Sequence, residues 1–312
     1  CRLPDLRAVH SEGPVKAPTA TVPHVMATIL SISSRVVRGC VGNTLASFAL
    51  QRSGHEVWEV PTVVWDRHPG LGRPTGLTIG GSDLAGLLAD FREAAQARRI
   101  GMVLTGYFAA PEQIAVVRDF IEALRSDGHA PHVCCDPVSA DAPGPYVSAA
   151  VLDALCLELV PLADSLTPNR FELGHLSGRS VETIADVVAA ARALGRPLCL
   201  VTSAPTASPD TIANVLVTPD AAWRSEVPRR SRVPNGTGDL MTALFAAHLA
   251  HGETPQVAMA RAAAGVASVL EATPVGAEAL ALVPAQDALA APSAQAPVEI
   301  LSKPDAGPRH ER

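Results

Sequence analysis

The sequence predicts an α/β fold in which a mostly parallel sheet is covered by helices on both faces. Short apolar runs alternate along the chain with longer segments of helical periodicity, a pattern typical of parallel strands joined by crossover helices. Of the 312 residues, 47% are hydrophobic and 18% are charged, which is enough apolar material to bury a sizeable core. Length alone leaves open whether the chain forms one large domain or two.

Seven short apolar runs are predicted to be strands, at residues 25–32, 56–60, 100–104, 132–135, 164–166, 198–201 and 212–217. Six segments between them have helical periodicity, at residues 43–52, 84–97, 111–126, 181–194, 239–251 and 255–271. Four glycines stand where helices are expected to end: Gly54, Gly128, Gly195 and Gly252.

The segment 61–81 interrupts this alternation. It is crowded with Gly and Pro, and it carries Trp65 and His68 without a helical period. Ligands of open α/β sheets bind beyond the carboxyl ends of the strands, so a segment of this kind is well placed to act as a flap. The segment could therefore be a lid or flap.

Both ends of the chain differ in composition from its middle. Residues 1–25 are rich in Pro, Ala and Thr and are expected to be a disordered extension. Residues 291–312 mix Pro, Ala and charged residues and are expected to be a flexible tail. One folded domain over residues 26–290 remains.

Composition also excludes several functions. The net charge of −6, without a dense basic run, argues against nucleic acid as a partner. Lysine occurs only at Lys16 and Lys303, which excludes a Walker A loop, a protein-kinase site and a Schiff base with pyridoxal phosphate. No apolar run is long enough to span a membrane, and the cysteines form no CxxC pair, so we expect a cytoplasmic protein.

The sharpest local signal is the turn Gly236, Thr237, Gly238 and Asp239, which opens a predicted helix. Backbone N–H groups at such a turn can hold an anion, and Asp239 in the first helical turn could accept a proton from an alcohol that attacks a phosphate. The alternative is an ordinary turn with an acidic residue favoured by the helix dipole. This signal alone leaves both interpretations open.

Four further clusters follow predicted strands. They contain residues 33–34 with 39–43, Asp136 with Asp141, residues 167–172, and residues 202–203. Each cluster alone fits an ordinary turn or a helix cap. All of them, with the turn at Asp239, fall at strand ends or at a helix start, so they could converge on one cleft.

His248 and His251 lie three residues apart on a predicted helix, a spacing that could serve a metal ion. No third ligand is apparent nearby in the sequence. We therefore interpret them as surface or packing histidines.

Six segments in this order carry a family resemblance: VVRGCVGN at 36–43, VLTGY at 103–107, CDPV at 135–138, LADSLTPNRFEL at 162–173, VTS at 201–203 and NGTGDL at 235–240. Together they resemble the pyridoxal kinase family of the ribokinase-like superfamily, over about residues 27–289. The resemblance implies a ribokinase-like three-layer fold with a flap over the active site. It also implies a homodimer.

The implied reaction transfers the γ-phosphoryl group of ATP to the 5′-hydroxymethyl group of pyridoxal, and also of pyridoxine and pyridoxamine, in vitamin B6 salvage. Mg²⁺ and a monovalent cation, K⁺ or Na⁺, are the implied cofactors. The scarcity of lysine is no objection, because phosphoryl transfer depends on positioning and charge stabilisation rather than on a covalent intermediate.

The resemblance also implies roles for individual residues on the phosphate side of the site. Asp239 would be the base, and the anion hole would be formed by Gly236, Thr237 and Gly238. Asp136 and Glu172 would bind Mg²⁺. The nucleotide phosphates would be met by Asn169, Thr202 and Ser203, and the monovalent cation by Asp141 and Thr167.

On the vitamin side, the implied contacts are Ser34, Trp65, His68 and Tyr107. Here the chain departs from the family pattern: it reads Ser-Ser-Arg at 33–35 in place of Gln-Ser-His, and Asp-Arg-His-Pro at 66–69 in place of Ser-Asn-His-Thr. Arg35 is expected to place a permanent charge beside the ring pocket.

These departures keep two alternatives open. One is a kinase of another hydroxymethyl heterocycle such as hydroxymethylpyrimidine, although the Gly-Ser-Asp and Gly-Gly-Ala-Gly patterns usual for such kinases are not visible here. The other is a degenerate kinase that binds pyridoxal without turnover. Retention of Asp239 and its neighbouring turn argues against the second alternative.

Overall fold

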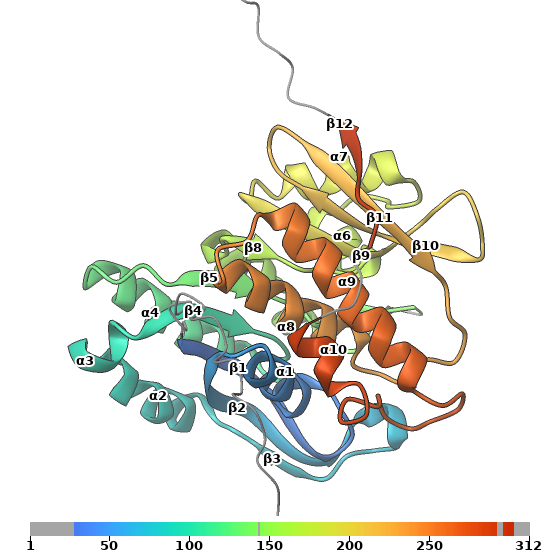
Figure 1. Ribbon diagram of the computed structural model, residues 1–312. Coiled ribbons are helices and arrows are strands. Elements are labelled where there is room, and N and C mark those ends of the chain that lie inside the picture. Colours follow the sequence, from blue (N-terminus) through green and yellow to red (C-terminus); the bar gives the residue numbers. More distant parts are fainter. Residues whose placement is uncertain (1–27, 143, 292–295, 303–312) are drawn as a thin grey trace, which may run out of the picture.

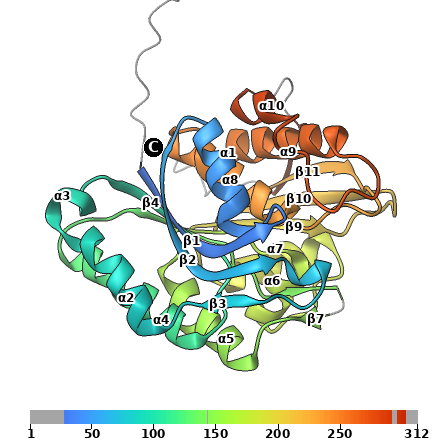
Figure 2. The ribbon, with the colours of Figure 1, turned by 90° about the horizontal axis from the view of Figure 1, so that it is seen from below.

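A ten-stranded sheet runs through the molecule, with helices on both of its faces (Figures 1 and 2). The structure is a computed structural model that describes residues 28–142, 144–291 and 296–302. The strand order is β12-β11-β10-β9-β8-β5-β4-β1-β2-β3. The six strands from β9 to β2 are parallel, and antiparallel strands are added at both edges.

The strands of this sheet are β1 Thr28–Arg38, β2 Glu56–Arg67, β3 Gly76–Thr78, β4 Ile100–Thr105, β5 His132–Cys135, β8 Ser165–Leu166, β9 Leu198–Ala204, β10 Thr211–Val217, β11 Ala222–Pro228 and β12 Glu299–Ser302. A separate small hairpin is formed by β6 Ala140–Asp141 and β7 Gly144–Pro145.

One face of the sheet carries α1 Gly42–Arg52, α8 Thr237–Ala250, α9 Pro255–Ala272 and α10 Gln286–Ala290 (Figure 2). The other face carries α2 Gly81–Ala89, α3 Ala94–Ala97, α4 Pro111–Ser126, α5 Ala149–Ala154, α6 Arg170–Ser177 and α7 Ile184–Ala193. Short 3₁₀ turns span Pro69–Leu71, Asp90–Arg92 and Val160–Leu162, and a π-helical turn spans Leu155–Leu159.

The sheet separates two hydrophobic cores. Successive side chains of a strand point to opposite faces, and β4 shows the result: Met102 and Leu104 pack into the core beneath α1 and α8, whereas Val103 packs into the core beneath α4. Because each face of the central strands is covered, these strands are apolar along their length rather than alternating. The architecture is the three-layer fold that the sequence predicts.

Most predicted elements are confirmed. The bounds of β5 and α4 agree with the prediction at both ends, and α4 begins with Pro111 at a position where proline is favoured. Each of the four glycines predicted to end a helix has a positive φ, between 63° and 91°. A positive φ costs glycine little and stops a right-handed helix.

Other predictions are wrong in detail. The single helix predicted over 84–97 is broken, because Glu93 adopts an extended conformation between Asp90–Arg92 and α3. The segment 61–81, which has no helical period, is largely a hairpin, since β2 continues to Arg67 and pairs antiparallel with β3. Neither β11 nor the helix α5 is among the predicted elements.

The predictions for the two ends of the chain have different outcomes. The predicted extension 1–25 lies outside the described residues. Within the predicted tail 291–312, residues Glu299–Ser302 form β12 and pair with β11 at the edge of the sheet (Figure 1). Among the described residues, no helix combines the length and the hydropathy needed to cross a membrane.

Candidate active site

The predicted site clusters lie at the carboxyl ends of the parallel strands. The strands β9, β8, β5, β4 and β1 are consecutive neighbours and parallel, so their carboxyl ends face the same side. A small pocket lies there, lined by Ser31, Ser33, Gly42, Ala46, Leu104, Thr105, Gly106, Asp136, Asp239 and Thr242. Two carboxylates that are far apart in the sequence, Asp136 and Asp239, therefore share one pocket.

The start of α8 forms one wall of the site. Gly236 precedes the helix with φ +104°, and a Cβ added there would meet the carbonyl oxygen of Cys40 at 2.1 Å. Only glycine therefore allows the loop before α8 to lie against the loop before α1. Among the described residues no side chain caps α8, so the first-turn N–H groups have no such partner and are available to an anion.

Asp239 lies in the first turn of α8. It accepts a backbone hydrogen bond from Gly42, which favours the carboxylate, but burial has the larger effect and raises the pKa of Asp239 to about 6. Gly42 itself has φ +52°, and a Cβ there would meet the hydroxyl oxygen of Ser34 at 2.3 Å. The predicted base is thus held by the glycine-rich turn after the first strand.

Three carboxyl groups gather at the site: Asp136, Glu172 and Asp239. Burial raises the pKa of Glu172 to about 7, and nearby Asp141 adds to the rise. Burial also raises the pKa of Asp136 well above its usual value, and the charges of Glu172 and Asp239 add to this rise. In the part of the chain that the structure describes, no arginine or histidine forms a salt bridge with any of the three.

Buried carboxylates that repel one another without a counter-ion favour a cation. Oxygen ligands from carboxylates, placed beside a site for phosphate, are the donor set that Mg²⁺ prefers. The residues therefore fit the predicted magnesium site.

Thr242 is a site residue that the sequence analysis missed. Its hydroxyl donates to Oδ2 of Asp136 at 3.0 Å and lies 2.8 Å from the hydroxyl oxygen of Thr167. It follows Asp239 by three residues, so both side chains lie on the same face of α8. That spacing from the predicted base is the only signal in the sequence that could have identified it.

Asn169 and Glu172 form a capping box at the start of α6. Asn169 Oδ1 accepts hydrogen bonds from the backbone N–H groups of Phe171 and Glu172, and its Nδ2 donates to the carbonyl of Ala140 at 2.8 Å. The helix-cap interpretation of this cluster is confirmed. A contact of Asn169 with nucleotide phosphates stays a prediction.

Thr202 lies beside this cap, because it forms a backbone bridge with Asn169 and donates its N–H to the carbonyl of Pro168. The next residue, Ser203, is exposed and has φ +55°. Positive φ is uncommon for a residue with a side chain and is found at functional sites more often than elsewhere. Thr202 is buried and Ser203 exposed near the end of β9, and contact of either with ATP stays a prediction.

The two residues predicted to hold a monovalent cation differ in exposure. Thr167 is 3% exposed and lies next to Thr242, whereas Asp141 is exposed in the β6–β7 hairpin. Asp141 lies near enough to Glu172 for its charge to raise the pKa of that residue. Joint binding of K⁺ or Na⁺ by Asp141 and Thr167 stays a prediction.

The hairpin of β2 and β3 is the predicted flap. Trp65 meets Tyr107 edge to face, with ring centroids 5.6 Å apart. The turn of the hairpin approaches the loop before α8, since a Cβ on Gly70 would lie 2.5 Å from Nδ2 of Asn235. His68, whose pKa is lowered by burial, accepts a hydrogen bond from the N–H of Gly70. Two predicted ring contacts, Trp65 and Tyr107, are therefore brought together.

Gln113 ties the flap to the body of the protein, and the sequence analysis missed it. Its Nε2 donates to the carbonyls of Thr62 and Ile79, and its Oε1 accepts from the N–H of Ala109. The side chain is completely buried at the start of α4. Nothing in the sequence distinguishes this glutamine from any other polar residue of a helix.

The predicted residues of the vitamin side differ in their surroundings. Arg35 is exposed and forms an ion pair with Glu59 on β2. The effect of its charge on the ring pocket stays a prediction. Ser34 is buried against Gly42, and it is Ser33 that lines the pocket. A hydrogen bond from Ser34 to the ring stays a prediction.

Comparison with known proteins gives consistent results. The family described as Phosphomethylpyrimidine kinase matches residues 83–282. The pyridoxal kinase PdxY of Corynebacterium diphtheriae is 34% identical over 281 residues, which cover 88% of this chain and 99% of that protein. The pyridoxal kinase PdxY of Leifsonia xyli subsp. xyli is 36% identical over 275 residues, covering 86% of this chain and 97% of that protein.

The same family appears among solved structures. Pyridoxal kinase from Leishmania donovani, in complex with ADP and pyridoxamine, superposes with a TM-score of 0.81 at 27% identity and covers 88% of this chain and 99% of its own. Agreement in sequence and in fold extends over nearly the full length of these relatives. The chain belongs to the pyridoxal kinase family of the ribokinase-like superfamily.

Proposed function

We propose that this protein is an ATP-dependent pyridoxal kinase. It transfers the γ-phosphoryl group of ATP to the 5′-hydroxymethyl group of pyridoxal, and also of pyridoxine and pyridoxamine, giving pyridoxal 5′-phosphate and its analogues in vitamin B6 salvage. Its relatives that are 31–38% identical over most of the chain are pyridoxal kinases, which supports this substrate class.

The observation that carries the proposal is the position of Asp239. The carboxylate lies in the first turn of α8, which no side chain of the described residues caps, in the pocket at the carboxyl ends of the parallel strands. With a pKa of about 6 it is mostly ionised at neutral pH and is still basic enough to take a proton from an alcohol.

In this mechanism the 5′-oxygen of the vitamer attacks the γ-phosphorus, and its proton passes to Asp239. The bond between the γ-phosphorus and the β,γ-bridging oxygen breaks, and ADP leaves. Backbone N–H groups of Gly236, Thr237 and Gly238 hold the transferred group, and one well-placed donor of this kind lowers a barrier by about 2.7–4 kcal/mol. Ser33, Trp65 and Tyr107 position the ring.

Asp136 and Glu172 are the residues that would hold Mg²⁺, directly or through water, while Thr242 fixes one oxygen of Asp136. When bound, the ion neutralises charge on the nucleotide phosphates. Asn169, Thr202 and Ser203 contact those phosphates. Asp141 and Thr167 hold K⁺ or Na⁺.

A second candidate is phosphorylation of a hydroxymethylpyrimidine. It is favoured by the description of the family that matches residues 83–282, Phosphomethylpyrimidine kinase. The scaffold and the base would be the same, and only the ring contacts would differ.

A substrate panel separates the candidates. The purified protein is incubated with Mg-ATP and, in parallel, pyridoxal, pyridoxine, pyridoxamine or hydroxymethylpyrimidine, and each phosphorylated product is quantified by liquid chromatography. We expect the highest kcat/KM with a B6 vitamer. Turnover of the pyrimidine alone would favour the second candidate, and pyridoxal binding without turnover of any substrate would favour a non-catalytic module.

We also propose that the protein is a homodimer in the cytoplasm. Leu77 on the edge strand β3 is 66% exposed and Val37 on β1 is 80% exposed, and exposed apolar side chains suit an interface with a second copy. Light scattering on the purified protein should give twice the chain mass. Leu77→Lys is expected to shift the mass toward the monomer.

A further inference from the structure

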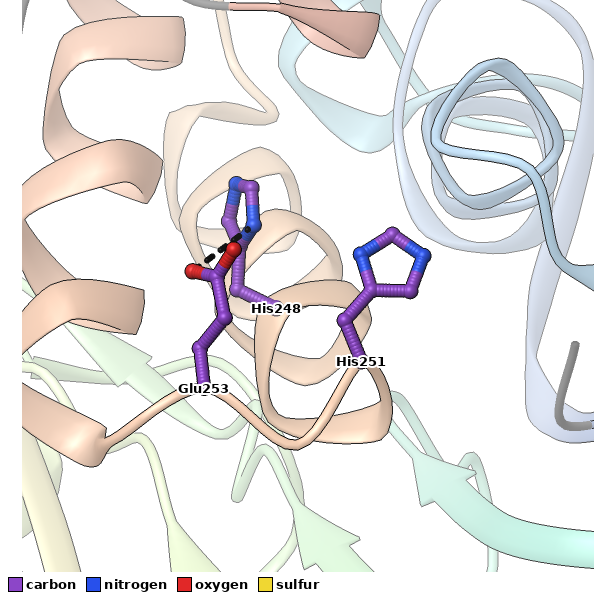
Figure 3. A group of neighbouring side chains, drawn as sticks. All are labelled: His248, His251 and Glu253. Carbon is purple, nitrogen blue, oxygen red and sulfur yellow. Dashed lines mark ion pairs between the residues drawn. The ribbon is translucent and has the colours of Figure 1, made fainter. Parts of the chain in front are cut away.

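A group of metal-ligating side chains lies at the opposite end of α8 from Asp239. His248 lies in the last turn of the helix, His251 is its C-terminal cap, and Glu253 follows in the connection to α9. Gly252, with φ +77°, turns the chain there, and Glu253 donates its backbone N–H to the carbonyl of His248. The three side chains gather at the helix end (Figure 3).

The ligand atoms of these residues lie within 4.8 Å of one another. Zn²⁺ in a tetrahedral site binds nitrogen and oxygen at about 2.0–2.1 Å, which sets its ligands about 3.4 Å apart. The widest pair therefore has to close by at most about 1.4 Å. Adjustments of this size can come from the side-chain torsions of the three residues, and Glu253 lies in a connection rather than inside a helix.

The donor atoms of His248 and Glu253 are unsatisfied. His248 is 3% exposed, and among the described residues neither of its ring nitrogens has a hydrogen-bond partner. Glu253 Oε2 is also buried without a hydrogen-bond partner among the described residues, and it lies 3.4 Å from Nδ1 of His248 (Figure 3). A buried polar group without a partner destabilises the folded state, so a ligand for these atoms would stabilise the fold.

An ion pair between His248 and Glu253 is the simpler alternative. The Nδ1 to Oε2 distance of 3.4 Å is longer than that of an ordinary N–H···O hydrogen bond, and among the described residues neither atom has a hydrogen-bond partner. The carboxylate of Glu253 already has a charged partner, since its Oε1 accepts from Arg261 at 2.8 Å. This pairing fixes one oxygen and leaves Oε2 on the side of His248.

We propose that His248, His251 and Glu253 bind a transition-metal dication of the Zn²⁺ type, with water as the remaining ligand. Two imidazoles and one carboxylate match the donors that Zn²⁺ takes in proteins, whereas Mg²⁺ prefers oxygen ligands alone. The ring of His55 stacks on that of His251, with centroids 4.3 Å apart, and limits the rotation of His251. Glu253 supplies the third ligand that was not apparent in the sequence.

This site does not depend on the proposed kinase activity. His251 follows Asp239 by twelve residues, or about 18 Å along an α-helix. The ion would join the end of α8 to the start of α9 and have a structural role. The charge of Arg261 opposes a cation, so we expect weaker binding than at a zinc site with four protein ligands.

Calorimetric titration tests the proposal. Zn²⁺ is added to the full chain after EDTA treatment and thiol alkylation, with Mg²⁺ in excess to occupy the carboxylates of the active site. We expect one equivalent to bind, and His251→Ala and Glu253→Gln each to weaken binding at least tenfold. His175→Ala, which removes an exposed histidine of α6, is the matched control and should leave the affinity unchanged.

A spectroscopic measurement guards against a folding defect in a variant. Co²⁺ added in place of Zn²⁺ should give the strong visible absorption of a tetrahedral ion with the parent protein and with His175→Ala, but not with Glu253→Gln of native circular dichroism. The proposal is overturned if the parent binds no Zn²⁺, or if folded His251→Ala and Glu253→Gln bind it as tightly as the parent does.

Discussion

At the scale of single residues, Gly236 is a position where the backbone itself requires one amino acid. Its φ of +104° and the 2.1 Å approach of an added Cβ to the carbonyl of Cys40 leave no room for a side chain. We expect Gly236→Ala to lower the free energy of unfolding by at least about 1–2 kcal/mol, the cost of a side chain in this backbone region.

Gly238 is the matched control for that substitution, because an added Cβ would meet nothing within 4 Å. Gly238→Ala is expected to leave the free energy of unfolding unchanged or to raise it by up to about 1 kcal/mol, as alanine does inside a helix. Urea denaturation monitored by circular dichroism measures both. Equal effects of the two substitutions would contradict the assigned close packing of the loops.

Thr242 supports a second residue-scale prediction. Thr242→Val keeps the shape of the side chain but removes the hydroxyl that donates to Asp136. A hydrogen bond to a charged group contributes about 1.5–3 kcal/mol, so we expect kcat/KM at limiting Mg²⁺ to fall by roughly ten- to a hundredfold. Ser268→Ala, which removes a hydroxyl bonded to Ala264 on α9, is the control and should have wild-type kinetics.

At the scale of elements, the flap hairpin depends on one buried glutamine. Gln113→Leu would leave the carbonyls of Thr62 and Ile79 without their donor and would free the hairpin from α4. We expect the KM for pyridoxal to rise several-fold with a smaller change in kcat, because the flap positions the ring rather than the phosphates.

Hydrogen exchange provides the direct measurement for the flap. Amides of β2 and β3 should exchange faster in Gln113→Leu than in the parent, while those of α8 should not change. Unchanged exchange in the hairpin, together with a raised KM, would show that Gln113 acts in some other way.

The sequence predicts elements well where the local signals agree. For α4, an apolar period, Pro111 and Gly128 all point to the same helix, and its bounds are correct. The break at Glu93 carries no glycine or proline, so nothing local predicts it. The strands β11 and β12 include exposed charged residues such as Glu226, and β12 pairs with residues some 75 positions away, a contact that no local pattern encodes.

The residues of the candidate site likewise divide into those that the sequence could predict and those that it could not. Asp136, Glu172 and Asp239 could be predicted to converge, because each follows a strand or opens a helix at the same edge of a parallel sheet. Thr242 and Gln113 could not, since each is an ordinary helical residue until the fold places it beside Asp136 or the flap.

At the scale of the whole molecule, the carboxyl groups of the site link stability to pH and to Mg²⁺. Folding raises the pKa of Glu172 to about 7 and that of Asp239 to about 6. Between the usual carboxyl pKa near 4 and these values, the folded chain binds more protons than the unfolded chain. The contribution of these groups to the free energy of unfolding therefore falls as pH rises through this window.

Mg²⁺ should offset this loss, because it binds the deprotonated carboxylates. His248, with its pKa lowered to about 4, changes the pH dependence of stability in the opposite sense over part of this window. The quantity to compare is therefore the difference in Tm with and without Mg²⁺ at each pH. We expect the rise in Tm on replacing EDTA with Mg²⁺ to grow between pH 5 and pH 8 in scanning fluorimetry. The growth should be much smaller in Glu172→Gln, and a Tm rise independent of pH would contradict a magnesium site at these carboxylates.

The central claim is that Asp239 is the base of a B6 vitamer kinase. The most direct test is the formation of pyridoxal 5′-phosphate from pyridoxal and Mg-ATP by the parent protein and by Asp239→Asn, with nucleotide affinity measured in parallel by calorimetry. The amide keeps the shape of the side chain but cannot take the proton, so we expect kcat to fall by about 10²–10⁴ while ATP affinity is kept. Near-native turnover by Asp239→Asn would contradict the account.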